Sequence, residues 1–202
     1  MSNLFNYANP SNWQIAIPDG QLTKGFTLNA QGVTLPAITI PPTKQVAGQY
    51  GLAVADYPSS HVEFDPLVVR FIVDEHLESY LNLYTWMLSI VDYNNGNSTA
   101  WKDSMPEAVQ VHMMDNERRN IVCTFNFYGC WCSQLGELEL TYTDDMHESL
   151  VCTAILPFKT MSIERDGQLI VPRPAIQAAD RQRVEGIKAM HPALESNKRL
   201  IL

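Results

Sequence analysis

Residue types that could do chemistry are present in this chain, but their spacing assembles no recognisable reactive site. No nucleophile elbow of the GxSxG type, no GxGxxG turn and no phosphate-binding loop occurs. The five histidines are scattered and form neither a metal-ligand pair nor a nucleophile–base pair; they stand at positions 61, 76, 112, 147 and 191. We therefore expect no catalytic residue, no cofactor site and no metal site.

The four cysteines, Cys123, Cys130, Cys132 and Cys152, fall in segments that resemble strands. Cys130 and Cys132 form a CxC pair, whereas zinc knuckles and thioredoxin-like sites use CxxC. No second CxC and no nearby histidine pair completes a tetrahedral zinc site. Buried free cysteines are ordinary core residues, and disulfides are rare in a reducing cytoplasm. These thiols are therefore predicted to be structural.

Two acidic features deserve a chemical interpretation. Glu137 and Glu139 alternate in LGELELTY and could be the paired carboxylates of a glycosidase. A solvated strand face beside an acidic turn explains them better. Asp74 precedes a segment with helical spacing, so it is predicted to cap a helix over about residues 75–91, with Glu75 and Glu78 near the positive end of the helix dipole.

Length and composition limit the class of protein. The chain has 202 residues, of which 46% are apolar, enough for one well-buried core. Its formal net charge of −8 argues against a basic nucleic-acid reader, although an acidic wall would let DNA slide past. No signal-like N-terminus and no membrane-spanning apolar run is found. We expect a soluble chain inside a cell, with no membrane partner.

Alternating apolar residues predict most of the elements. Phe26, Leu28 and Ala30 suggest a strand within residues 26–40, and further strands are expected at 13–17, 62–73, 108–114, 121–132, 135–142 and 149–163. Residues 43–60 fit either a loop or a long hairpin prone to pair with another chain's edge. One helix among many strands predicts a mainly β fold, a β-sandwich or half-barrel with one α-helix packed on it.

The predicted helix carries an apolar stripe that is expected to cover the sheet. A charge at Leu81 or Tyr84 should then abolish folding or assembly. The stripe recurs at steps of three and four residues and comprises Leu77, Tyr80, Leu81, Tyr84, Leu88 and Val91.

Changes in composition divide the chain into three parts. Residues 1–11 form an N-terminal arm, residues 12–165 a β domain, and residues 166–202 a proline-interrupted extension with one short helix over 178–190. The extension ends in the apolar KRLIL. A segment of this composition does not fold alone, which favours assembly onto a neighbour or onto the body.

The order of the motifs resembles a known family over residues 12–163. LPAITIP, then FDPLVVRFIVDE with YTWM, then GCWCSQLGELELTYTDD follow one another as in the tail tube proteins of contractile-tailed bacteriophages. Baseplate tube initiators share the pattern, and type VI secretion tube proteins share it more distantly. The resemblance implies a structural virion protein of the phage tail, assembled in the host cytoplasm.

The resemblance also implies stacked hexameric rings, whose inner strands join into one continuous barrel. Strands 121–128 and 151–158, or else 26–40 and 62–73, would line that barrel. The helix would face a neighbouring subunit or the sheath, the segment 43–60 and the arm would reach the next ring, and Glu137 and Glu139 could face the lumen. The implied partners are further copies of the chain, the tail sheath, baseplate and tail terminator proteins and the tape measure protein, with DNA passing through unbound.

By size, the chain is expected to be the repeating subunit of the tube, which forms the channel for DNA ejection. Its C-terminal extension departs from the compact family pattern, so a baseplate tube initiator or a tail terminator ring stays as the alternative. A monomeric β-barrel that binds a small apolar ligand is a more distant one. The residues expected to serve packing or assembly are Phe64, Leu67, Asp74, Leu77, Tyr80, Leu81, Tyr84, Trp86, Leu88, Trp131, Leu138 and Leu140.

Overall fold

The computed structural model describes residues 7–18, 24–47, 53–98, 108–140 and 149–172. By its internal contacts the chain divides into two units, Met1–Leu169 and Ile170–Leu202. The second unit is described only at residues 170–172, so the predicted helix over 178–190 lies outside the described residues. The fold below is that of the first unit.

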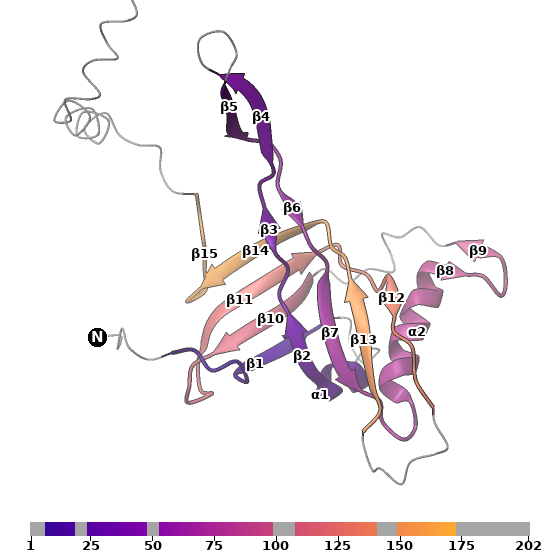
Figure 1. Ribbon diagram of the computed structural model, residues 1–202. Coiled ribbons are helices and arrows are strands. Elements are labelled where there is room, and N and C mark those ends of the chain that lie inside the picture. The colour runs from indigo at the N-terminus through magenta and orange to yellow at the C-terminus, as the bar shows by residue number, and fades with distance from the viewer. Residues whose placement is uncertain (1–6, 19–23, 48–52, 99–107, 141–148, 173–202) are drawn as a thin grey trace, which may run out of the picture. The chain divides into compact units, whose positions relative to one another are not determined.

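A five-stranded antiparallel sheet forms one layer (Figure 1). Its residues alternate between an apolar face and a polar face, as the sequence pattern predicts for strands with one face in a core. Val111 lies opposite Phe125, and Phe127 opposite Met161, on the apolar side. The strands, in spatial order, are β1 (Trp13–Ala16), β10 (Ala108–Met114), β11 (Ile121–Tyr128), β14 (Thr160–Arg165) and β15 (Gln168–Leu169).

A four-stranded antiparallel sheet forms the second layer, in the order β12 (Gln134–Leu135), β13 (Val151–Leu156), β7 (Leu67–Ile72) and β2 (Ala30–Thr34). In β7 the residues Leu67, Val69 and Phe71 are completely buried, while the intervening residues face the other way. The register between β2 and β7 shifts between Ala30 and Gly32.

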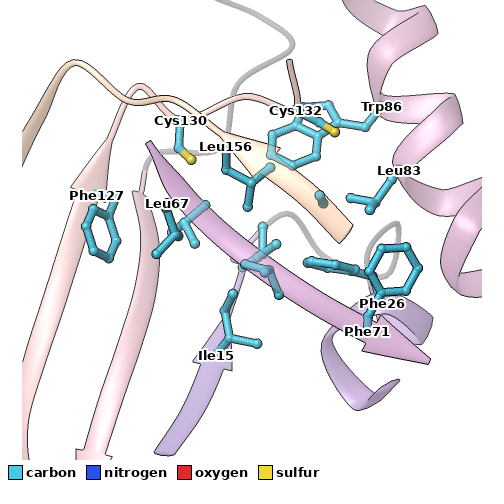
Figure 2. Close-up of a cluster of buried hydrophobic side chains, with 14 of the residues drawn as sticks. Ile15, Phe26, Leu67, Phe71, Leu83, Trp86, Phe127, Cys130, Cys132 and Leu156 are labelled. Atoms are coloured by element: carbon cyan, nitrogen blue, oxygen red, sulfur yellow. The ribbon is translucent and has the colours of Figure 1, made fainter. Parts of the chain in front are cut away.

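One hydrophobic core joins the inner faces of both sheets (Figure 2). Phe26 packs edge-on against Phe71 with ring centroids 5.1 Å apart, and Phe127 packs against Phe158 at 4.9 Å. Such aromatic pairs stabilise a core beyond the area that they bury. The predicted mainly β fold, with sheets and helix packed on one core, is confirmed.

The first predicted strand begins as a helix. α1 (Lys24–Asn29) buries Phe26 against Phe71 and leaves Leu28 74% exposed, so the expected alternation of residues 26, 28 and 30 is wrong. The strand proper is the shorter β2. The burial of a single phenylalanine decides this segment, because a short apolar run fits either period.

The second helix, α2 (Glu78–Ile90), begins three residues later than predicted and turns a different face to the core. Leu83 and Trp86 point into the core (Figure 2). Leu81 is 47% exposed and Leu77 is exposed as well. The expectation that Leu77 and Leu81 cover the sheet is therefore wrong. The helix is apolar on opposite sides, and periodicity alone does not say which side turns inward.

Two other strands differ from the prediction. The segment expected as one strand over 149–163 changes sheets at Pro157, so that β13 and β14 lie in different layers. The strand expected at 135–142 ends at Leu135 within the residues described, and residues 141 and 142 lie outside them. Cys130 and Cys132 lie in the connection after β11, not on a strand.

Three short two-stranded ladders complete the unit. β3 (Ile38–Thr39) pairs with β6 (Glu63–Phe64), and β8 (Val91–Asp92) with β9 (Asn97–Ser98). β4 (Pro42–Ala47) pairs with β5 (Ala53–Pro58), so the segment 43–60 contains a hairpin. Between β2 and β7 the chain thus runs out along β3 and β4 and returns along β5 and β6 (Figure 1). We call β3, β4, β5 and β6 the ribbon.

Candidate assembly surfaces

The described residues contain no group of histidine, cysteine and carboxylate side chains that could hold a metal ion. Burial raises the pKa of the Cys130 and Cys132 thiols to about 12, so both stay protonated at neutral pH. A thiol in that state is neither a nucleophile nor a metal ligand. The cysteines of the core therefore act by packing.

Asp74 organises the corner where β7 turns into α2. Its carboxylate accepts hydrogen bonds from the backbone N–H groups of Glu78 and Ser79, each at 2.9 Å, and from the Ser79 hydroxyl at 2.7 Å. The Ser79 hydroxyl also lies 3.1 Å from the carbonyl of Ile72. Asp74 thus satisfies the free N–H groups of the first helical turn, as predicted, although Leu77 occupies the formal N-cap position.

These hydrogen bonds, above all those from Ser79, hold the pKa of Asp74 well below its usual 3.8. A carboxyl group with a lowered folded-state pKa stabilises the fold above its unfolded pKa, and the stabilisation fades as the pH falls through the folded one. Asp74→Ala should therefore lower the thermal unfolding midpoint at pH 7, and the deficit should shrink as the pH drops below 3.8. The matched control is Asp65→Ala. Asp65 is exposed, and its backbone N–H donates a hydrogen bond to the carbonyl of Ala37, a bond that the substitution keeps. A deficit that stayed constant down to strongly acidic pH would contradict this role of the carboxylate.

The ribbon presents several apolar side chains that are largely exposed. Val46 and Val54 face each other across β4 and β5 and are 71% and 66% exposed. Ile38 on β3 and Ile40 just after it are exposed too, whereas the ring of Phe64 on β6 packs against Phe158 with centroids 5.6 Å apart. A lone two-stranded hairpin is only marginally stable in water, and unprotected strand edges pair readily with other chains. The ribbon therefore has the character of a docking element.

The four-stranded sheet has an outer face, turned away from the core, that bears few charges. Arg70 stands at its centre, between Gly32 on β2 and Thr153 on β13. The remaining residues of this face are small, β-branched or amide-bearing, namely Thr34, Val68, Ile72, Gln134, Val151 and Ile155. Both edges of this sheet end in short strands, β2 and the two-residue β12.

The outer face of the five-stranded sheet is a closed polar network instead. Gln110 donates a hydrogen bond to Asn126, and Asn126 donates one to Glu164, each at 2.8 Å. Ser162 and Tyr128 share a further bond on the same face. Asn126 is buried, so these two hydrogen bonds of its side-chain amide are needed to offset the loss of hydrogen bonds to water. This face is already satisfied within the subunit.

The residues expected to serve packing or assembly separate into two groups. Leu67 and Trp86 are buried, and Tyr80, Trp131 and Leu138 pack against the core. Leu88 is half-buried, and the hydroxyls of Tyr84 and Tyr93 lie 2.6 Å apart. The exposed group comprises Phe64, Leu77, Leu81, Leu140, Glu137 and Glu139. Their part in assembly stays a prediction.

Sequence reasoning missed two positions with clear structural roles. Leu83 is completely buried in the core yet lies outside the predicted stripe. Arg70 is a single charge inside the apolar run LVVRFI, and the alternation of this strand was the only sequence signal for the side on which it lies. Alternation places Arg70 opposite the core, but it does not say what that face meets.

A groove of about 340 Å³, lined by β1, α1 and the start of β2, opens to solvent. The described part of the chain contains no helix that is long and apolar enough to cross a membrane. The described residues thus present open strand edges, an exposed ribbon and a sheet face on which Arg70 is the one charged side chain. These features define a structural module built to contact other protein chains.

Comparison with known proteins agrees with this class. Residues 10–162 match the family described as T4-like virus tail tube protein gp19. The chain is 44% identical over 170 residues, 84% of its own length and 96% of the relative, to the tail tube terminator protein of Enterobacteria phage T4. The chain belongs to the T4-like tail tube protein family, and it is therefore a structural protein of the phage tail and not an enzyme.

Solved structures share the fold at low sequence identity. The tube-terminating cap of the anti-feeding prophage has a TM-score of 0.57 at 10% identity, covering 79% of this chain and 92% of the cap protein. The sheath/tube terminator of the PVC extracellular contractile injection system also has a TM-score of 0.57, at 12% identity, covering 79% of this chain and 99% of that protein. A chain of the extended sheath–tube complex of the PVC system scores 0.56.

Proposed function

We propose that this chain is the terminator of a contractile phage tail tube, a ring-forming protein that ends the tube. The observation that carries the proposal is the 44% identity to a tail tube terminator across 96% of that relative. The sequence-based preference for the repeating tube subunit gives way to its alternative, a terminator ring. The family match by itself supports either role.

In the proposed hexameric ring, the four-stranded sheet faces the channel. The sequence left two strand pairs open for the channel wall. β11 and β13 belong to different sheets and do not form one wall, whereas β2 and β7 are neighbours in the four-stranded sheet, together with β13. The sheet also has two open edges, and joining β2 of one subunit to the β12 side of the next leaves no edge unpaired in a closed ring.

The ribbon is proposed to dock on the adjacent ring of the tube. Its exposed valines and isoleucines lose contact with water there, and its strands gain partners. The outward side of α2, with Leu77 and Leu81, would face a neighbouring subunit or a sheath component. Further copies of the chain, the tube and the sheath are the partners that this arrangement supports, with DNA passing through the ring.

The alternative of a monomeric small-ligand binder has less support. Such a protein keeps a chamber between its sheets, whereas here the space is filled by Phe26, Phe71, Phe127 and the aliphatic core residues around them. A binder of this kind also gains nothing from an exposed apolar ribbon.

The assembly state of the purified chain tests the proposal. A terminator should form single rings that do not grow, visible by negative-stain electron microscopy and as one species by size-exclusion chromatography with light scattering. A repeating tube subunit should instead polymerise into long tubes. A chain that stays monomeric at every concentration and salt condition contradicts both roles.

A further inference from the structure

Arg70 is the one charged side chain on the outer face of the four-stranded sheet, as far as the described residues show. It is exposed, and its cross-strand neighbours are Gly32 and Thr153. A Cβ placed on Gly32 would lie 3.8 Å from the Arg70 Cβ, an ordinary contact. Arg70 is thus an exposed charge on a face whose other ladder residues are uncharged.

No acidic partner neutralises this arginine within the described part of the chain. Arg118, by contrast, donates to Asn12 and Ser11. The ion pairs between described residues lie elsewhere and join His61 with Glu63, Arg119 with Glu117, and Arg165 with Asp166. Among the described residues Arg70 has neither a carboxylate nor a hydrogen-bonded side chain beside it, so its guanidinium donors are available to a partner outside the subunit.

We propose that Arg70 of every subunit faces the channel of the assembled ring and binds the phosphate backbone of duplex DNA. This inference rests on the proposed function, because it requires the ring and the inward orientation of the four-stranded sheet. A guanidinium presents a planar fork of N–H donors that matches phosphate oxygens, and it stays charged at any physiological pH. Ring symmetry repeats that fork at one height of the channel.

The symmetry of the ring repeats the Arg70 contact in every subunit, so that weak single contacts add up. A single exposed arginine adds little affinity, but several held on one rigid ring act together at high effective concentration. The net charge of −8 keeps the rest of the protein from attracting DNA, so contact is confined to the channel. Glu137 and Glu139 follow the end of β12 and are exposed, and their expected place in the lumen stays a prediction.

Duplex DNA fits this site better than an acidic peptide does. Duplex DNA carries a phosphate about every 1.7 Å along its axis, so a ring of guanidinium groups meets phosphates at any rotation of the duplex. The rest of the face consists of Thr, Val, Ile, Gln and Gly, with no aromatic side chain to stack on a base. The contact is therefore independent of base sequence and yields as salt rises.

The test uses purified rings of the full chain and a short fluorescently labelled duplex, followed by fluorescence anisotropy. Rings of the unchanged protein should bind at about 50 mM salt and release the duplex towards 200 mM. Arg70→Ala should weaken binding on the order of tenfold and flatten the salt dependence, uniformly across duplex sequences. Arg70→Lys should retain part of the affinity, since it keeps the charge but loses the fork. Arg119→Ala removes an exposed arginine outside this face and should change nothing.

Each step has an outcome that overturns the inference. Ring assembly is checked first, by size-exclusion chromatography, and failure to form rings refutes the proposed function before DNA is added. Rings that do not bind the duplex at low salt, or Arg70→Ala rings that bind it as well as the unchanged protein, refute the role of Arg70 alone. If Arg70→Ala disturbs assembly, the pair Arg70→Lys and Arg70→Gln isolates the charge at similar side-chain length. Binding of poly-glutamate in place of the duplex would overturn the choice of DNA.

Discussion

Replacing Leu83 by Asp is expected to abolish folding. Leu83 is completely buried on the inner side of α2, in contact with the core shared by both sheets (Figure 2). Truncating such a leucine to alanine alone costs about 2–5 kcal/mol, and a buried carboxylate without a partner adds the cost of losing its water. A domain with about 5–15 kcal/mol of stability does not tolerate that sum.

Leu81→Asp is the matched comparison, since it places the same change two residues away on the opposite side of the helix. The Leu81 side chain is 47% exposed, so the variant should fold with a circular dichroism spectrum and an unfolding midpoint close to those of the unchanged protein. Leu83→Asp should give insoluble or unfolded chain in the same measurement. If Leu81→Asp failed to fold while Leu83→Asp folded, the inward orientation of Leu83 on α2 would be contradicted.

Replacing the exposed valine pair of the ribbon by charged residues should abolish association with tail tubes and leave the subunit folded. Val46 and Val54 are opposite each other and exposed, so the double variant Val46→Lys with Val54→Glu puts opposite charges on facing positions of the hairpin. The hairpin keeps its cross-strand attraction, but its apolar docking surface is gone. Sedimentation should show folded protein that no longer associates with tail tubes.

The control for the ribbon is Ile121→Lys, which introduces a charge at an exposed apolar side chain at the start of β11. It should leave association with tubes intact. If the ribbon variant binds tubes as the unchanged protein does, the ribbon is not the docking element. If the two variants lose association equally, the effect belongs to surface charge and not to the ribbon.

Where the sequence predicted structure well, a single periodicity dominated. β10 lies where AVQVHMM predicts it, and β11 covers the first eight residues of the strand expected at 121–132, because alternation with one buried face admits only one register on the core. The strand expected at 62–73 is divided into β6, in the ribbon, and β7, in the four-stranded sheet. Asp74 at the start of the next element is a typical helix-capping residue.

The failures have a common physical cause, since long-range contacts decided between local alternatives. Phe26 packs on Phe71, a residue 45 positions further along the chain, and this contact makes α1 a helix. α2 is apolar on two sides, and only the position of the core shows that Leu83 is inside and Leu81 outside. The β13–β14 segment changes sheets at Pro157, a residue that cannot donate a ladder hydrogen bond.

The candidate surfaces were predictable in kind more than in detail. The alternation in LVVRFI places Arg70 opposite the core, and the open question about residues 43–60 already included a hairpin with an exposed edge. Which faces stay uncovered depends on how two sheets and a helix pack, which no local pattern contains. The assignment to the family rested on the order of motifs, and the match over residues 10–162 confirms it.

The length distribution of tail tubes assembled with and without this chain tests the terminator proposal most directly. Tubes grown from the tube subunit of the same phage, imaged by electron microscopy, should become shorter as the chain is added, with the chain located at one end by gold labelling. The ribbon variant at the same concentration should leave the lengths unchanged. Label distributed along the whole tube, with growth continuing at the same rate, would show that the chain is a repeating subunit and contradict the proposal.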